Sequence, residues 1–183
     1  QRWPGINVIL QDNFYGQALE RVNSGEVDFA IAPYHKEDPR FDFELLFREE
    51  LLVTAPLGHP LLAEDSVSLE AVSQHPIITM PPQASIRGNI ADAFAEKGLE
   101  FEPGFQTLHQ MSIISMVRAG FGVTFLPRIA IPTVNMDQLG TVPVEAPGLY
   151  RRICLTTAHG RAIQPAAETM METVRDVLGG GPP

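Results

Sequence analysis

One sequence unit occurs twice in this chain of 183 residues, and the repetition constrains the fold more than any other feature. The first copy begins with the β-branched run 7–11, which predicts a strand. Apolar residues at helical spacing follow, with Asn13 as the expected N-cap and Gly25 as the expected stop of the helix. The run 27–32 then predicts a buried strand that ends at Pro33. This order of elements is typical of a β-α-β unit.

The second copy repeats the same order later in the chain. Residues 105–107 predict a strand, 109–119 predict a helix, and Gly120 is the expected helix stop. The run 122–126 predicts a further strand that ends at Pro127. Because β-α-β crossovers place their strands parallel in one sheet, the two copies predict two related lobes, each a parallel sheet flanked by helices.

Two apolar runs, 51–55 and 152–158, predict strands that connect the lobes. The chain would leave the first lobe through 51–55 and return to it through 152–158, so the two strands would lie side by side as a hinge. Such a hinge lets two lobes close on a ligand. We therefore expect three parts, namely a first lobe of residues 1–52 and 158–178, a second lobe of residues 53–157, and a tail of residues 179–183.

The charge of the chain argues against nucleic acid as a direct partner. Thirteen Lys and Arg stand against 22 Asp and Glu, which gives a formal net charge of −9, and no basic cluster offers the positive field that DNA or an anionic membrane requires. No apolar stretch reaches the roughly 20 residues of a bilayer span. The one cysteine, Cys154, cannot form a disulfide or a Cys-based zinc site within a single chain. Together with the lack of an export signal, this predicts a cytoplasmic protein.

The sequence gives little support to an enzyme. It contains no GxSxG, HExxH, P-loop or GxGxxG motif, and its five histidines show no metal-ligand spacing. We therefore expect no catalytic residue, no metal and no cofactor.

The candidate chemistry lies at three expected helix starts, at Asn13-Phe14, Ser85 and Leu108-His109. Ligands of open α/β sheets bind at the carboxyl ends of strands, where free backbone N–H groups and helix dipoles favour a negative group. A small carboxylate in the cleft between the lobes fits this pattern. The alternative is that Asn13 and Ser85 only cap their helices and that His109 is a solvent-exposed loop residue.

Three segments carry a resemblance to a known family. DFAIAP at 28–33, ELLVTAPLGHPL at 50–61 and MVRAGFGVTFLP at 116–127 resemble recurring segments of the effector-binding domain of LysR-type transcriptional regulators. The resemblance implies an α/β fold of two Rossmann-like lobes joined by two crossing strands, like that of type II periplasmic binding proteins. It also implies a ligand-sensing domain of a bacterial regulator. A solute-binding protein of a transport system shares this architecture and is the alternative.

The resemblance further implies partners. Members bind a small effector, form homodimers or tetramers, and contact DNA through a winged helix-turn-helix that precedes this domain and is absent from the sequence. In side-by-side dimers the segments that match 86–97 and 101–107 face the second subunit. The family's domain normally opens with a strand and a helix before the segment that matches Pro4-Gly5, and neither is found here.

The family's pockets are lined at the positions that match Phe14, Pro33 and Leu108, and all three are apolar in this chain. This implies an effector with an aromatic or aliphatic body and one polar end, held mostly by Ser85, His109 and backbone N–H groups. Tyr34 is either a contact at the pocket rim or a surface aromatic. The full set of candidate effector-binding residues is Asn13, Phe14, Pro33, Tyr34, Ser85, Thr107, Leu108 and His109.

Overall fold

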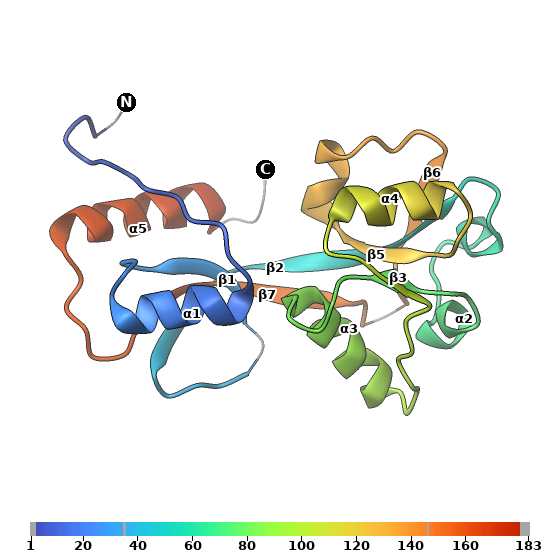
Figure 1. Ribbon diagram of the computed structural model, residues 1–183, viewed down its shortest axis with the longest axis horizontal. Coiled ribbons are helices and arrows are strands. Elements are labelled where there is room, and N and C mark those ends of the chain that lie inside the picture. Colours follow the sequence, from blue (N-terminus) through green and yellow to red (C-terminus); the bar gives the residue numbers. More distant parts are fainter. Residues whose placement is uncertain (1–2, 35, 146, 180–183) are drawn as a thin grey trace. The chain divides into compact units, whose positions relative to one another are not determined.

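The computed structural model describes residues 3–34, 36–145 and 147–179, and its chain divides into two compact units. Unit 1 comprises residues 1–47 and 152–183, and unit 2 comprises residues 48–151. Two long strands, β2 (Phe41–Pro56) and β7 (Tyr150–Ala158), each belong in part to both units and are neighbours in one sheet (Figure 1). The prediction of two crossing strands between the lobes is therefore confirmed, and the predicted tail at 179–183 lies almost wholly outside the described residues.

Unit 1 is a sheet with one helix on each face. Its third strand is β1 (Ala30–Tyr34), and its helices are α1 (Tyr15–Ser24) and α5 (Pro165–Leu178). Side chains alternate between the faces of a strand, so Ala158 of β7 packs with α1 while Leu155 packs with Met171 of α5. Gly25 ends α1 in the left-handed conformation, with φ 79°, and Pro165 stands at the start of α5, both as predicted.

The prediction of a parallel β-α-β unit in this part of the chain was wrong. Residues 7–11 form no strand, and the Leu10 side chain is 92% exposed. A β-branched run favours extended backbone, but it becomes a strand only where a neighbouring strand takes up its hydrogen bonds, and no described strand does so here. β1 instead pairs antiparallel with β7, with Ala32 opposite Cys154.

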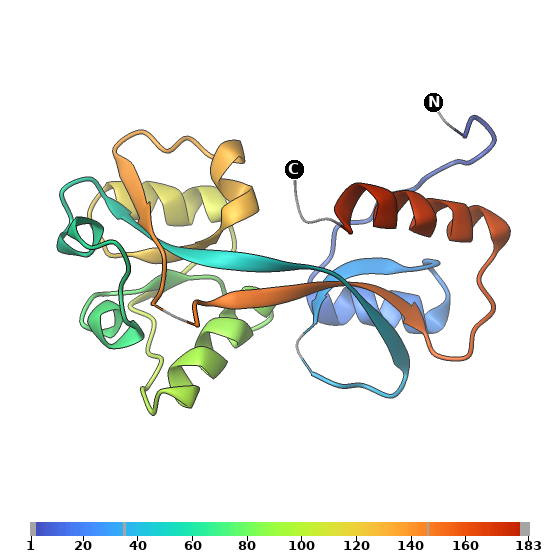
Figure 2. The ribbon, with the colours of Figure 1, turned by 180° about the vertical axis from the view of Figure 1, so that it is seen from behind.

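Unit 2 contains a parallel pair, but not the one that the second sequence copy predicts: residues 77–79, from outside that copy, take up the parallel pairing of both 105–107 and Val123. Strand β3 (Ile78–Thr79) lies parallel to β4 (Phe105–Gln106), and Ile77 bridges Val123 in parallel. The remaining strands, β5 (Thr124–Pro127) and β6 (Leu139–Val142), pair antiparallel with β2. Figure 2 shows β2 and β7 side by side from the reverse direction, as Figure 1 does from the front.

Two apolar clusters hold unit 2 together, on opposite sides of β5. Phe125 joins the cluster that receives Ile90 and Phe94 of α3 (Ser85–Glu96), and Leu126 joins the cluster that receives Ile114 of α4 (Gln110–Arg118). The short helix α2 (Leu69–Ser73) packs with the first cluster. No helix among the described residues is long and apolar enough to cross a membrane.

Candidate functional site

In unit 2, the starts of α3 and α4 follow two neighbouring parallel strands. The backbone N–H of Thr107 donates to the carbonyl of Thr79 over 3.1 Å, which extends the pairing of β3 and β4 to their carboxyl ends. The chain enters α3 at Ser85 soon after β3, and it enters α4 at Gln110 soon after β4. Both helix N-termini therefore lie at the edge of the sheet where ligands of α/β proteins bind.

Three polar side chains at this edge have no hydrogen-bond partner among the described residues. They are the hydroxyls of Ser85 and Thr107 and the imidazole of His109. Leu108 is 56% exposed, so its side chain is not part of the core of unit 2. This edge, made of Ser85, Thr107, Leu108 and His109, thus offers polar groups beside an apolar wall, and we call it the α3/α4 edge.

The expectation that Ser85 caps α3 was wrong. The N-cap is Ala84, which makes no side-chain hydrogen bond, and Ser85 is the first residue inside the helix. A residue inside the helix cannot direct its hydroxyl at the amides two or three positions further on, as an N-cap does. The Ser85 hydroxyl and the first amides of α3 are therefore available to a ligand.

The predicted residues of unit 1 lie at the start of α1 and at the end of β1. Phe14 is the N-cap of α1, without a side-chain hydrogen bond, so the expected N-cap Asn13 lies one position too early to fill that role. Phe14 is largely exposed. Pro33 and Tyr34 are the last two residues of β1. Helix α1 packs on this strand, with Tyr15 of the helix and Ala30 of the strand in one apolar cluster. The prediction that these residues and the α3/α4 edge face one cleft stays a prediction.

Tyr34 is a half-buried ring held between two other side chains. Its ring lies edge-on to Phe43 at 5.1 Å, and the guanidinium of Arg152 lies over it at 4.0 Å from the ring centroid. The register of β1 and β7 sets Tyr34 opposite Arg152. Sequence reasoning missed Arg152. The sequence signal that could have found it is the pair Arg151-Arg152 at the start of an apolar strand. Side chains alternate between the faces of a strand, so the two arginines must lie on opposite faces and have different surroundings.

Arg151 makes a different contact from its neighbour. Its guanidinium donates to the carboxylate of Glu49 over 2.5 Å, and Glu49 is only 3% exposed. The second carboxylate oxygen of Glu49 is buried without a partner among the described atoms. The positive charge of Arg151 is therefore neutralised, whereas that of Arg152 is not.

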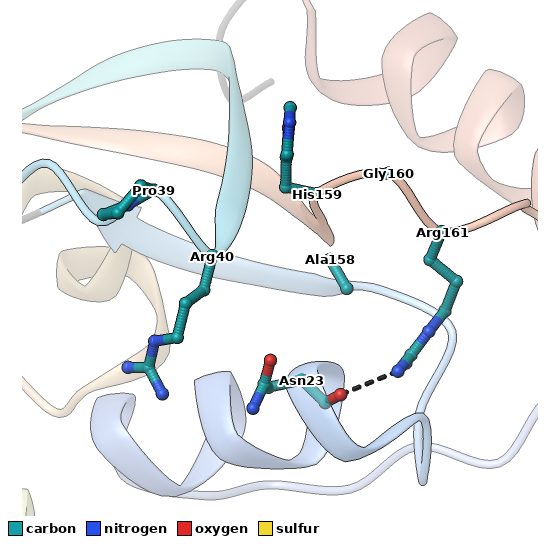
Figure 3. A pocket seen from close by; sticks show the side chains of 7 residues that line it. All are labelled: Asn23, Pro39, Arg40, Ala158, His159, Gly160 and Arg161. Carbon is teal, nitrogen blue, oxygen red and sulfur yellow. Dashed lines mark hydrogen bonds between the residues drawn. The ribbon is translucent and has the colours of Figure 1, made fainter.

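A hollow of about 420 Å³ in unit 1 contains none of the predicted residues (Figure 3). Its lining includes Arg40, His159 and Arg161, each of which already contacts a protein group. Arg40 pairs with Asp38 and Glu20, His159 contacts Asp42, and Arg161 donates to the last carbonyls of α1. The hydrogen bonds from Arg40 hold the pKa of Asp38 below its usual value, which keeps that pair charged. Because its two arginines already donate to protein acceptors, we do not assign the ligand site to this hollow.

Comparison with known proteins supports the architecture. The chain matches the model of the LysR substrate binding domain over residues 1–179. A Bacillus subtilis (strain 168) protein described as an uncharacterized HTH-type transcriptional regulator, YybE, is 25% identical over 174 residues, which cover 95% of this chain and 59% of that protein. The chain thus spans a little under three fifths of the length of this relative.

Two solved structures share the fold. The regulatory domain of Synechocystis PCC6803 CcmR in complex with 2-PG has a TM-score of 0.87 at 17% identity and covers all of this chain and 88% of its own. The BenM effector binding domain with its effector benzoate has a TM-score of 0.82 at 21% identity, covering 96% of this chain and 80% of that one. These likenesses confirm the predicted two-lobed fold, and the family match over residues 1–179 shows that this chain belongs to the LysR substrate binding domain family.

Proposed function

We propose that this chain is the effector-sensing part of a bacterial transcriptional regulator and that it binds a small carboxylate with an apolar body. The observation that carries the proposal is the α3/α4 edge. It joins two helix N-termini, three polar side chains without protein partners and the exposed Leu108. Helix N-termini favour negative groups, and a leucine wall favours an aliphatic or aromatic body.

The effector contacts we propose in unit 1 are Asn13, Phe14, Pro33 and Tyr34. Phe14 and Pro33 contribute apolar surface, whereas Asn13 contributes a side-chain amide that makes no hydrogen bond to a described residue. The effector's polar end is held by Ser85, Thr107 and His109 at the α3/α4 edge. The chain binds its ligand and does not convert it, in keeping with the description of its family as a binding domain.

The family match favours a regulator over a solute-binding protein of a transport system, because the relative that it resembles is a transcriptional regulator. We propose that the whole protein acts in the cytoplasm and contacts DNA through a winged helix-turn-helix outside these residues. The net charge of −9 supports this division of labour, since the present chain offers no positive surface to DNA.

We also propose that the chain pairs with a second copy through α3 and residues 101–107, as homodimer or tetramer. Phe105 on β4 and Phe121 lie edge to face with their ring centroids 5.7 Å apart, and both rings are exposed. Exposed aromatic pairs of this kind are enriched in protein interfaces.

A thermal-shift screen of small carboxylates, with benzoate as the first compound, tests ligand binding. Calorimetry then compares Ser85→Ala, Leu108→Glu and His109→Gln with the control Ser73→Ala, which changes a serine of α2 that bonds only to the backbone carbonyl of Glu70 and to Gln74. We expect the ligand to bind more weakly to the three variants and to bind the control with the affinity of the wild type. Equal affinity in all four would contradict the proposed site.

A further inference from the structure

Arg152 is an exposed arginine without an acidic partner. Within residues 3–34, 36–145 and 147–179 no carboxylate lies within ion-pair distance of its guanidinium, and none of its N–H groups donates to a protein acceptor. Among the described residues, the guanidinium instead lies over the Tyr34 ring, 4.0 Å from the ring centroid. In a chain with 22 acidic residues and 13 basic ones, an arginine that has found an aromatic ring and no acid needs a physical explanation.

The stacking on Tyr34 orients the guanidinium and leaves its donors free. A cation over a ring uses the flat face of the guanidinium, whereas the five N–H groups point outward in the plane of that face. A carboxylate can therefore approach the edge of the stacked guanidinium and accept two parallel hydrogen bonds. Phe43 holds the Tyr34 ring from its side at 5.1 Å, so the platform itself is packed in place.

Arg40 of the same unit shows what a merely structural stacked arginine looks like. Its guanidinium lies over Phe41 at 5.1 Å from the ring centroid, but it also makes ion pairs of 2.8 Å with Asp38 and Glu20. Arg151, the neighbour of Arg152 in β7, is likewise neutralised by Glu49. Arg152 stacks on a ring as Arg40 does, but it lacks the acidic partner that Arg40 and Arg151 each have among the described residues.

We propose that Arg152, held on Tyr34, recognises an oxyanion group of the effector from unit 1. This inference rests on the proposed function and adds to it a side chain that recognises the effector's charge, because Arg152 requires an acid where a neutral amide of the same shape would not serve. It also places charge recognition at the end of β1, where Pro33 supplies no donor and no charge. Arg152 binds the oxyanion, and Tyr34 is a positioning residue.

The test is an NMR titration of the 183-residue chain with sodium benzoate and, separately, with benzamide, its neutral counterpart. The Nε–Hε signal of Arg152 and the backbone amides of Ser85 and His109 are followed together. We expect benzoate to shift the Arg152 signal in a saturable way and benzamide to leave it unmoved. Arg152→Gln should weaken benzoate binding by about ten- to a hundredfold, the usual loss for a hydrogen bond to a charged group.

Four further variants separate recognition from structure. Tyr34→Leu removes the platform and should weaken benzoate binding by about two- to fivefold, whereas Tyr34→Phe keeps the ring and should weaken it less. Arg40→Gln is the matched control, since it removes a stacked but paired arginine, and benzoate binding should not change. Arg87→Gln changes the arginine that stacks on Phe101 in the first turn of α3. If benzoate binding is lost in Arg87→Gln and unchanged in Arg152→Gln, the inference is wrong.

The outcomes also separate this inference from the proposed function. If benzoate shifts the amides of Ser85 and His109 but not the Arg152 signal, the inference is wrong and the effector site stands. If benzamide binds as well as benzoate, the inference and the proposed carboxylate ligand are both wrong. If Arg152 shifts while the α3/α4 edge does not respond, the inference stands and the assignment of that edge falls. If benzoate moves none of these signals, both are contradicted.

Discussion

The guanidinium of Arg151 donates to the carboxylate of Glu49 over 2.5 Å, and this pair joins β7 to β2 where the two strands pass from one unit to the other. Glu49 is almost fully buried, whereas Arg151 keeps some access to solvent. A buried carboxylate without its cation carries an uncompensated charge, so removing only the arginine is costly.

We therefore expect Arg151→Leu to lower the free energy of unfolding by about 3 kcal/mol, as is typical when one partner of a buried ion pair is removed. The double variant Glu49→Leu, Arg151→Leu removes both charges and should recover most of that loss. Urea unfolding of the wild type and the two variants measures the difference. A double variant that is less stable than the single one would show that the pair does not act through charge.

Gly122 tests how β5 begins. Its φ is 156°, and a Cβ at this position would lie 2.1 Å from the carbonyl oxygen of Pro76, which accepts the backbone N–H of Val123 at 2.9 Å. Gly120 has φ 80° and open space around it. Gly120→Ala should therefore cost only the strain of a left-handed alanine, about 1 to 2 kcal/mol.

Gly122→Ala adds a clash with backbone atoms and should cost about 1 to 3 kcal/mol more than Gly120→Ala. Thermal unfolding of the two variants, measured side by side, gives the comparison. Equal losses would mean that the contact between Pro76 and residue 122 yields without cost.

His59 predicts a dependence of stability on pH. Its Nδ1 accepts the backbone N–H of Leu61 at 3.3 Å, and its ring lies 4.6 Å from that of His75. Burial, with a smaller contribution from the charge of His75, lowers the pKa of His59. The unfolded chain therefore binds this proton more readily than the folded one. The contribution of His59 to stability is full above the ordinary histidine pKa of about 6.5 and is lost as the pH falls from there through the lowered pKa of the folded state.

The variant His59→Asn keeps a side-chain acceptor at the start of the 3-10 turn and removes the titration. Its unfolding temperature should fall less than that of the wild type between about pH 7.5 and about pH 5.5. Parallel loss of stability in both proteins would assign the acid sensitivity to other groups.

The exposed Phe105 and Phe121 pair predicts the behaviour of the chain in sedimentation. If α3 and residues 101–107 pair with a second copy, Phe105→Ser should shift the equilibrium toward monomer at a given concentration, because it removes an exposed aromatic ring from that surface. Leu57→Ser changes an exposed leucine outside that surface and serves as the control. A wild-type chain that is already monomeric would contradict the proposed pairing surface.

The sequence predicted those features that depend on local chemistry. Gly25 and Pro165 mark helix ends because a left-handed residue and a ring-locked φ suit those positions whatever surrounds them. The helix of the second copy was also recognisable, since apolar residues at helical spacing and the left-handed Gly120 mark α4 and its end.

The errors arose where a residue's role depends on a neighbour from elsewhere in the chain. The run 7–11 has strand composition but no described partner strand, and Asn13 and Ser85 miss the N-cap position by one residue each. Arg152 acquires its contact with Tyr34 only through the register between β1 and β7, which residue types alone do not specify.

The most direct test of the account is a map of backbone amide shifts in the 183-residue chain on titration with the carboxylate that stabilises it most in the thermal-shift screen. The proposed function predicts that the largest shifts fall at residues 85–87 and 107–111 in unit 2 and, in unit 1, at the amides of Ala32 and Tyr34 that flank Pro33. Shifts centred instead on the hollow lined by Arg40, His159 and Arg161, with the α3/α4 edge unmoved, would contradict it.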